Sequence, residues 1–162
     1  MLDLNKNFVD EVYDENGHVV DYTLKCPENF NFAYDVVDAI AAAEPDKRAL
    51  LWCNPAGEER IFTYGDLKYY SDKTANMLRE KGIKKGDMVM VILKRHYQFW
   101  FTILALHKLG AVIIPATFML QKHDIVYRAK AATIKAVICT GDGDIAEQVD
   151  EALPECPSLE TR

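Results

Sequence analysis

The stretch that decides the fold is DMVMVILKRHYQFWFTILALHKLGAVIIPA, residues 87–116. It begins with a short apolar run up to Leu93 that is rich in Val and Ile, which is typical of a strand buried on both faces. A run without Pro or internal Gly follows and ends at Gly110, the residue type that commonly takes the left-handed position after a helix. A second short apolar run ends at Pro115, which has no N–H to give to a neighbouring strand. This order predicts a βαβ unit whose two strands are parallel neighbours joined by a right-handed crossover.

The helix predicted within this unit has almost no polar face. Its apolar residues are Tyr97, Phe99, Trp100, Phe101, Ile103, Leu104, Ala105, Leu106 and Leu109. A helix that is apolar on all sides is covered on more than one side. The sheet can cover one side, and we expect later helices of this chain or a further domain to cover the other.

Residues 1–30 are interpreted as an N-terminal arm. A turn is expected at residues 14–17, where Gly17 follows polar residues, and an edge strand at residues 18–24. The next segment, from Phe32 to about residue 43, has apolar residues at helical spacing. Asn31 precedes it and is a good N-cap for that helix.

Residues 49–53 and 60–63 read as two strands of a hairpin joined by a Pro/Gly turn. A helix is expected to begin after Thr63, with Asp66 completing a weak capping box, and to end at Gly82. Its predicted buried stripe consists of Leu67, Tyr70, Thr74, Met77 and Leu78.

After Pro115 the pattern predicts a loop, a helix at residues 123–132, a strand at 135–139 and a helix at 144–153. The expected buried residues of the first of these helices are Ile125, Tyr127 and Ala129. The fold class is therefore α/β, a mostly parallel sheet with helices on both faces. Residues 31–162 are interpreted as one α/β subdomain that follows the arm.

Composition narrows the function classes. The 162 residues are 49% hydrophobic and 27% charged, which is ordinary for a soluble globular domain. The net charge of −6 is concentrated at acidic ends around a mildly basic middle, which argues against a nucleic-acid partner. The N-terminus lacks a signal-peptide pattern, and no apolar run reaches the ~20 residues of a membrane span. We therefore expect a cytoplasmic protein with no membrane span.

Cysteine and histidine positions indicate no metal site. The four cysteines, at positions 26, 53, 139 and 156, form no C-x-x-C pair and have no His at ligand spacing. Cys53 and Cys139 lie in apolar runs, where a reduced thiol behaves as a small hydrophobic group. His107 lies on the apolar helix and is interpreted as a core histidine whose hydrogen bonds are satisfied.

Residues 141–146, GDGDIA, formally fit the G-x-G-x-x-A pattern of a dinucleotide site. The charges oppose that function, because Asp142 and Asp144 would lie beside the phosphates that a helix N-terminus attracts. A turn followed by a helix cap is the favoured interpretation, and a stand-alone nucleotide-binding module remains the alternative.

Lys94, Arg95 and His96 follow the first strand of the βαβ unit. Ligands of open α/β sheets bind at the carboxyl ends of the strands, so these residues are candidates for ligand contact. Basic residues beside a helix start are, however, more often plain surface. No Walker A sequence, nucleophile elbow or paired metal ligands are present, so motifs alone reveal no catalytic residue.

The order of several short motifs resembles the N-terminal part of AMP-forming acyl-CoA synthetases, the adenylating superfamily. The general signals are FTYGDL at 62–67, KGDMV at 85–89 and LGAVIIP at 109–115. Two further stretches are similar to the medium-chain branch of that family. They are NFNFAYDVVD at 29–38, and DIVYR at 124–128 followed by KAVI at 135–138. The resemblance implies that the chain is part of the large N-terminal domain of an adenylate-forming enzyme.

The resemblance also implies a reaction. Such enzymes use ATP, Mg²⁺ and CoA to convert a small-molecule carboxylic acid into acyl-CoA, AMP and pyrophosphate. Their phosphate loop, adenine-binding stretch, ribose-binding Asp and catalytic Lys come later than this chain extends. The 162 residues alone are therefore expected to be inactive and to bind none of these cofactors well, and their expected partner is the remainder of their own chain.

The family places the loop after the LGAVIIP strand near bound CoA, so Ala116, Thr117 and Met119 are expected on the CoA side. The medium-chain branch often has Gln where this chain has Met119, and a thioether accepts hydrogen bonds only weakly. A non-catalytic assembly module that uses the exposed apolar helix face is a further alternative.

Overall fold

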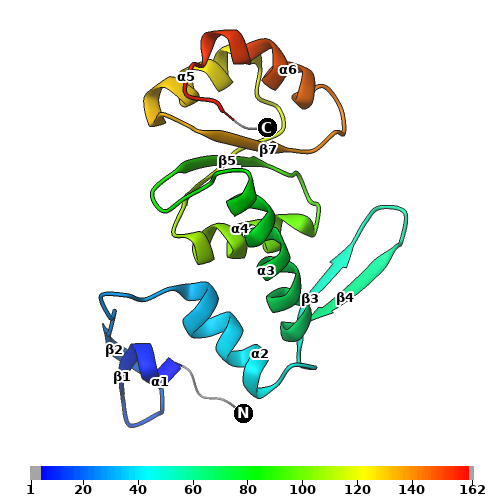
Figure 1. Ribbon diagram of the computed structural model, residues 1–162. Coiled ribbons are helices and arrows are strands. Elements are labelled where there is room, and N and C mark those ends of the chain that lie inside the picture. The colour runs from blue at the N-terminus through cyan, green and yellow to red at the C-terminus, as the bar shows by residue number, and fades with distance from the viewer. Residues whose placement is uncertain (1–4, 161–162) are drawn as a thin grey trace.

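The computed structural model describes residues 5–160, and its centre is a small parallel sheet (Figure 1). The sheet has three strands in the order β6 (Val112–Pro115), β5 (Met88–Ile92) and β7 (Ala136–Cys139), all parallel. Helix α4 (Gln98–Leu109) connects β5 to β6 and ends at Gly110, which has a φ of 68°. The predicted βαβ unit is confirmed as to its helix and its two parallel neighbouring strands, and so is the α/β fold class.

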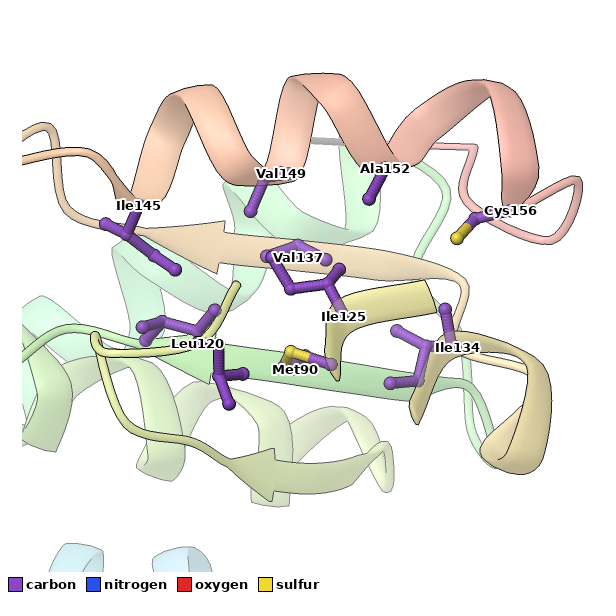
Figure 2. Close-up of a cluster of buried hydrophobic side chains, with 11 residues drawn as sticks. Met90, Leu120, Ile125, Ile134, Val137, Ile145, Val149, Ala152 and Cys156 are labelled. Carbon is purple, nitrogen blue, oxygen red and sulfur yellow. The ribbon is translucent and has the colours of Figure 1, made fainter. Parts of the chain in front are cut away.

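Strand β5 is buried on both faces because neighbouring residues point into different cores. Val89 and Val91 pack into a cluster with side chains of α3 (Tyr64–Glu80) and α4. Met90 and Ile92 pack into the opposite cluster, which Figure 2 shows between the sheet and the helices above it. All four side chains are at most 1% exposed.

The second cluster is closed by α5 (Lys122–Ala132), α6 (Ile145–Ala152) and the short 3-10 helix η2 (Leu153–Glu155). Helix α5 buries Ile125 and Ala129, as expected, but Tyr127 is 71% exposed. Tyr127 lies two positions from each of these residues, which turns it to the other side of a helix with 3.6 residues per turn. The prediction that Tyr127 is buried is therefore wrong.

Helix α4 is covered by elements that precede it in the chain. Its other neighbours are α3 and the π-helical segment η1 (Phe32–Asp38), which continues into α2 (Ala39–Ala43). The expectation that later helices or a further domain provide this cover is therefore wrong for most of α4. Trp100 remains 46% exposed.

The buried face of α3 is formed by Leu67, Ser71, Ala75 and Leu78. Tyr70 and Met77, which the sequence placed on that face, are 40% and 47% exposed. Ala75 packs with Ala105 and Leu106 of α4 in the buried cluster, whereas Tyr70 stacks its ring on Phe101 of α4 at a centroid distance of 4.9 Å and stays partly exposed. The prediction is therefore correct for Leu67 and Leu78, the first and last residues of the stripe. Between them, the buried residues are Ser71 and Ala75, each one position away from a predicted residue.

Lys108 of α4 forms ion pairs with two neighbouring elements, η1 and α3. Its side chain is 1% exposed, and Nζ donates to Asp38 Oδ1 at 2.9 Å and to Asp72 Oδ1 at 2.6 Å. Burial alone would raise the pKa of Asp72, but hydrogen bonds from Lys108 and Lys68 hold that pKa below its usual value. These contacts join η1, α3 and α4 through a buried lysine that is fully paired.

Two antiparallel hairpins complete the described part of the chain. Strand β3 (Arg48–Cys53) pairs with β4 (Glu59–Thr63), as the sequence predicts. Near the N-terminus, α1 (Asn5–Phe8) leads into β1 (Val9–Tyr13), which pairs with β2 (Val19–Leu24) and was not predicted. This hairpin lies apart from the parallel sheet in Figure 1. Within residues 5–160, no helix is both long and apolar enough to cross a membrane.

Both predicted helix caps are present. Asn31 Oδ1 accepts from the amides of Ala33 and Tyr34 at the start of η1. Thr63 Oγ1 accepts from Asp66 N at 3.1 Å, and Asp66 Oδ2 accepts from Thr63 N at 2.9 Å. The Thr63–Asp66 capping box therefore satisfies two amides that have no partner within α3.

Replacing Thr63 with Ala should lower the free energy of unfolding by about 1 kcal/mol, because one of these amides loses its acceptor. Urea denaturation followed by circular dichroism measures the change. Thr74→Ala is the matched control, since Thr74 Oγ1 only donates to the helical Tyr70 carbonyl, and it should change stability by less than about 0.5 kcal/mol. Equal losses in the two variants would contradict the role assigned to the capping box.

Candidate functional site

The three parallel strands end at one edge of the sheet, and the loops that follow them form the candidate site. Residues 93–97 follow β5, residues 116–121 follow β6, and residues 140–144 follow β7. This is the edge at which open α/β sheets bind ligands. The sequence prediction that Lys94, Arg95 and His96 lie at this edge is confirmed.

His96 joins the loop after β5 to the loop after β7. Its Nε2 lies 2.9 Å from Asp142 Oδ2 and 3.1 Å from Thr140 Oγ1. Thr140 Oγ1 also accepts from Asp142 N at 3.1 Å, and the Thr140 side chain is buried. We call this set of contacts among His96, Thr140 and Asp142 the His96 latch. It holds together two loops that are more than forty residues apart in sequence.

The turn before the latch is strained. His96 N donates to Leu93 O at 2.9 Å and closes a turn whose second residue, Lys94, has a φ of 47°. The backbone of a residue that carries a Cβ seldom adopts this left-handed conformation. Lys94 extends over the loop after β6, where Nζ lies 4.7 Å from the centroid of the Phe118 ring.

Two grooves flank Lys94. The first, of about 440 Å³, is lined by Trp52, Asn54, Lys94, Arg95, His96, Phe118 and Asp142. The second, of about 310 Å³, is lined by Lys94, residues 118–121, residues 142–145 and Gln148. The β3–β4 hairpin forms one wall of the first groove, because Trp52 Nε1 donates to Arg95 O at 2.7 Å. A ligand at this edge would therefore meet aromatic surface and positive charge together.

The expected CoA-side residues lie in the loop after β6. Ala116 is half-buried and its amide donates to Val91 O at 3.0 Å, which extends the β5–β6 ladder by one bond. Thr117 is exposed, and its Oγ1 accepts from Met119 N at 3.3 Å. Met119 is 69% exposed and lines the second groove. Thr117 and Met119 are thus accessible to a ligand, whereas the amide of Ala116 is used in a hydrogen bond that extends the sheet.

Residues 141–146 form a turn and the start of α6. Gly143 takes a φ of 73°, and Asp144 is the N-cap of α6 without a side-chain cap bond. Asp142 is the acceptor of the His96 latch, and both Asp142 and Asp144 line the second groove. Both carboxylates therefore lie in the turn that precedes α6, where their negative charges would oppose a phosphate at the start of that helix.

A larger hollow, of about 630 Å³, lies at the opposite edge of the sheet. Its charged residues are already paired: Asp87 Oδ2 accepts from Lys84 N at 2.7 Å and from Lys135 Nζ at 2.9 Å. Burial alone would raise the pKa of Asp87, but these bonds lower it below its usual value. The charged groups of this hollow are therefore engaged with one another, whereas Lys94 at the carboxyl edge forms no ion pair with a described residue.

Other candidate groups do not assemble into a reactive site. Residues 5–160 contain no group of three or more His, Cys, Asp or Glu side chains that could hold a metal ion. Cys139 is partly buried, whereas Cys53 is exposed and not the small core group we expected. His107 Nδ1 is buried without a partner among the described residues, so the expectation of satisfied hydrogen bonds is wrong. Burial lowers the pKa of His107, which keeps the ring neutral.

Comparison with known proteins places the chain in a family. The family described as AMP-binding enzyme matches residues 37–162. The acyl-coenzyme A synthetase ACSM5 of Rattus norvegicus is 39% identical over 142 residues, which cover 84% of this chain and 24% of the relative. ACSM4 of Mus musculus is 37% identical with the same coverage. The chain thus spans about a quarter of the length of these relatives.

Solved structures of other proteins have folds similar to that of this chain. The N-terminal subdomain of Klebsiella oxytoca NpsA is 28% identical, with a TM-score of 0.60 over 67% of this chain and 27% of that protein. A fatty acyl CoA synthetase of Mycobacterium tuberculosis has a TM-score of 0.71 at 20% identity, over 81% of this chain and 26% of its own. The second match supports the fold alone.

The comparisons also correct one expectation. The curated relatives ACSM5 and ACSM4 are named mitochondrial. These names contradict the expectation of a cytoplasmic protein. The expectation rested on the lack of a signal-peptide pattern and of a long apolar run, and neither feature bears on import into mitochondria. The family resemblance seen in the sequence motifs is confirmed over most of the described chain, and the chain belongs to the AMP-binding enzyme family.

Proposed function

We propose that this chain forms the first α/β part of an AMP-forming acyl-CoA ligase of the medium-chain branch. The observation that carries the proposal is the 37–39% identity, over 142 residues, to relatives named acyl-coenzyme A synthetases. The reaction joins a carboxylic acid to CoA. The carboxylate attacks the α-phosphate of ATP to give an acyl-adenylate and pyrophosphate, and the thiol of CoA then displaces AMP.

Bound ATP and Mg²⁺ would supply the activated phosphate for this reaction. The contribution of the present residues is to build the sheet and to position the loops at its carboxyl edge. The charges at this edge suit a phosphate-bearing ligand, since Lys94 and Arg95 line the first groove and Asp142 is engaged by His96. Asp144 on the second groove opposes such a ligand, so the first groove fits it better.

The loop after β6 is proposed to lie on the CoA side of the site. Thr117 and Met119 are exposed and close together, and Met119 gives an apolar surface to a flexible thiol-bearing chain. Ala116 holds the start of the loop on the sheet through its bond to Val91. In this proposal Thr117 and Met119 touch CoA and Ala116 positions them.

An assembly module is the second candidate, and one observation favours it. An apolar groove of about 230 Å³ runs between η1, the β3–α3 region and α4. Phe32 and Trp100, which line it, are 47% and 46% exposed. A defined oligomer of the 162-residue chain at low concentration would support this candidate over the ligase.

A segment exchange tests the ligase proposal. The matching segment of the rat relative is replaced with this chain, and carboxylate-dependent ATP–pyrophosphate exchange is measured with medium-chain acids. We expect exchange well above background. As a control, Ile92→Asp in the same chimera should abolish exchange, because it buries an unpaired charge in the centre of the sheet. A folded chimera that shows no exchange would count against the proposal.

Variants of the loop after β6 test the CoA side in the same chimera. The double variant Thr117→Ala, Met119→Ala should raise KM for CoA about five- to thirtyfold, since each of the two lost contacts is worth roughly 0.5–1 kcal/mol. ATP–pyrophosphate exchange needs no thiol and should be unchanged. Tyr127→Ala, on the outer face of α5, is the control and should alter neither reaction. If the double variant slows exchange and leaves KM for CoA untouched, the loop does not lie on the CoA side.

A further inference from the structure

Lys94 occupies a backbone conformation that glycine would adopt more easily. Among residues 5–160, Lys94 and Thr133 are the two non-glycine residues with a positive φ, at 47° and 50°. Thr133 follows α5 as its C-cap, where a left-handed residue is common. Lys94 caps no helix. A strained residue at a ligand-binding edge persists when its surroundings hold it there, and such residues cluster at functional sites.

The surroundings of Lys94 hold it from both sides. The bond from His96 N to Leu93 O closes the turn that contains Lys94. The His96 latch then fastens the end of this turn to the loop after β7, through Asp142 and Thr140. The turn cannot relax without breaking the latch. The contacts that hold this turn thus come from residues of the candidate site, since His96 and Asp142 both line the first groove.

The Lys94 side chain lies between two loops, in a groove that Asp142 and Asp144 also line, and its ammonium group forms no ion pair with a described residue. Its ammonium group sits 4.7 Å from the centroid of the Phe118 ring. On its other side is Gly143, where an added Cβ would lie 3.7 Å from Nζ. No carboxylate of the described residues forms an ion pair with Lys94 or with Arg95. The nearest acidic side chain of the latch, Asp142, is bonded to His96.

We propose that Lys94 is an anion-binding residue at the carboxyl edge, and that it takes a phosphate group of a nucleotide-type ligand in the first groove. An ammonium group binds phosphate as a point charge. Trp52 and Phe118 line the same groove, and aromatic side chains stack on planar bases. The His96 latch positions Lys94 and does not touch the ligand. The inference rests on the proposed function for the choice of ligands, because ATP and CoA both carry such phosphates.

The test is a titration of the ¹⁵N-labelled 162-residue chain with inorganic pyrophosphate, ATP and CoA, each at millimolar concentration, followed by amide NMR shifts. We expect weak binding that moves the amides of Lys94, Phe118 and Gly143. Lys94→Gln should weaken this binding about tenfold or more, because a charged contact is lost. Lys94→Arg should retain most of it. Shifts with CoA but not ATP would assign the phosphate to CoA, and the reverse would assign it to ATP.

Lys94→Gly separates strain from binding. Glycine relieves the strain, so this variant should unfold at a temperature no lower than the parent chain and yet lose binding as Lys94→Gln does. Thr133→Gly is the matched control, because it relieves a similar backbone conformation at the opposite edge of the sheet and should leave binding unchanged.

Absence of shifts at these amides with all three ligands would overturn the inference, and so would equal affinity in Lys94→Gln. Neither result would bear on the ligase proposal, which stands or falls on ATP–pyrophosphate exchange by the chimera.

Discussion

Burial of β5 on both faces is the constraint on which the rest of the structure depends. Val89 and Val91 need one apolar layer, and Met90 and Ile92 need another. Helices α3 and α4 supply the first, and α5 and α6 supply the second. Because all three strands of the sheet run parallel, the connections from β5 to β6 and from β6 to β7 must be crossovers. Helices α4 and α5 are these crossovers, and each belongs to a different layer. One strand thus explains both the layers and their order along the chain.

The same parallel arrangement creates the candidate site. Parallel strands deliver their following loops to one edge, so residues far apart in sequence meet there without a dedicated binding domain. Strand β5 lies between β6 and β7, and the turn after it therefore contacts the loops on both sides. Lys94 reaches toward Phe118, and His96 binds Asp142. The rigid element is the sheet, and the chemistry is carried by loops fixed to it, as in many α/β proteins.

The elements that the sequence predicted best are those with local physical causes. Gly110 ends α4, Thr63 and Asp66 cap α3, and short Val/Ile runs form buried strands. The predictions failed where tertiary contacts determine which residues are buried and which segments pair as strands. On α3 the small residues Ser71 and Ala75 are buried, whereas Tyr70 and Met77 are exposed in part, because the fit between packed helices and not apolar character alone decides which residues are buried. Strand β1 carries acidic residues and is exposed at every residue but the first, so it has no hydrophobic alternation by which the sequence could reveal it.

The location of the candidate site could be predicted from the sequence, but its backbone conformation and side-chain contacts could not. The position of Lys94, Arg95 and His96 after a parallel strand was enough to put them at the carboxyl edge. Nothing in the sequence indicates the left-handed conformation of Lys94, since no glycine marks that position. The His96 latch joins residues more than forty positions apart, and no local pattern pairs them. Catalytic groups could not be predicted from these residues, because the family motifs that carry them are absent from this chain.

The most direct test of the central claim is to purify the native gene product from its own cells with an antibody raised against this segment. The purified protein is then assayed for carboxylate-dependent ATP–pyrophosphate exchange. The account predicts a polypeptide several times larger than the 18.4 kDa of this chain, with exchange activity that co-purifies with it. A native product of 18.4 kDa without exchange activity would contradict the assignment of this chain to a ligase.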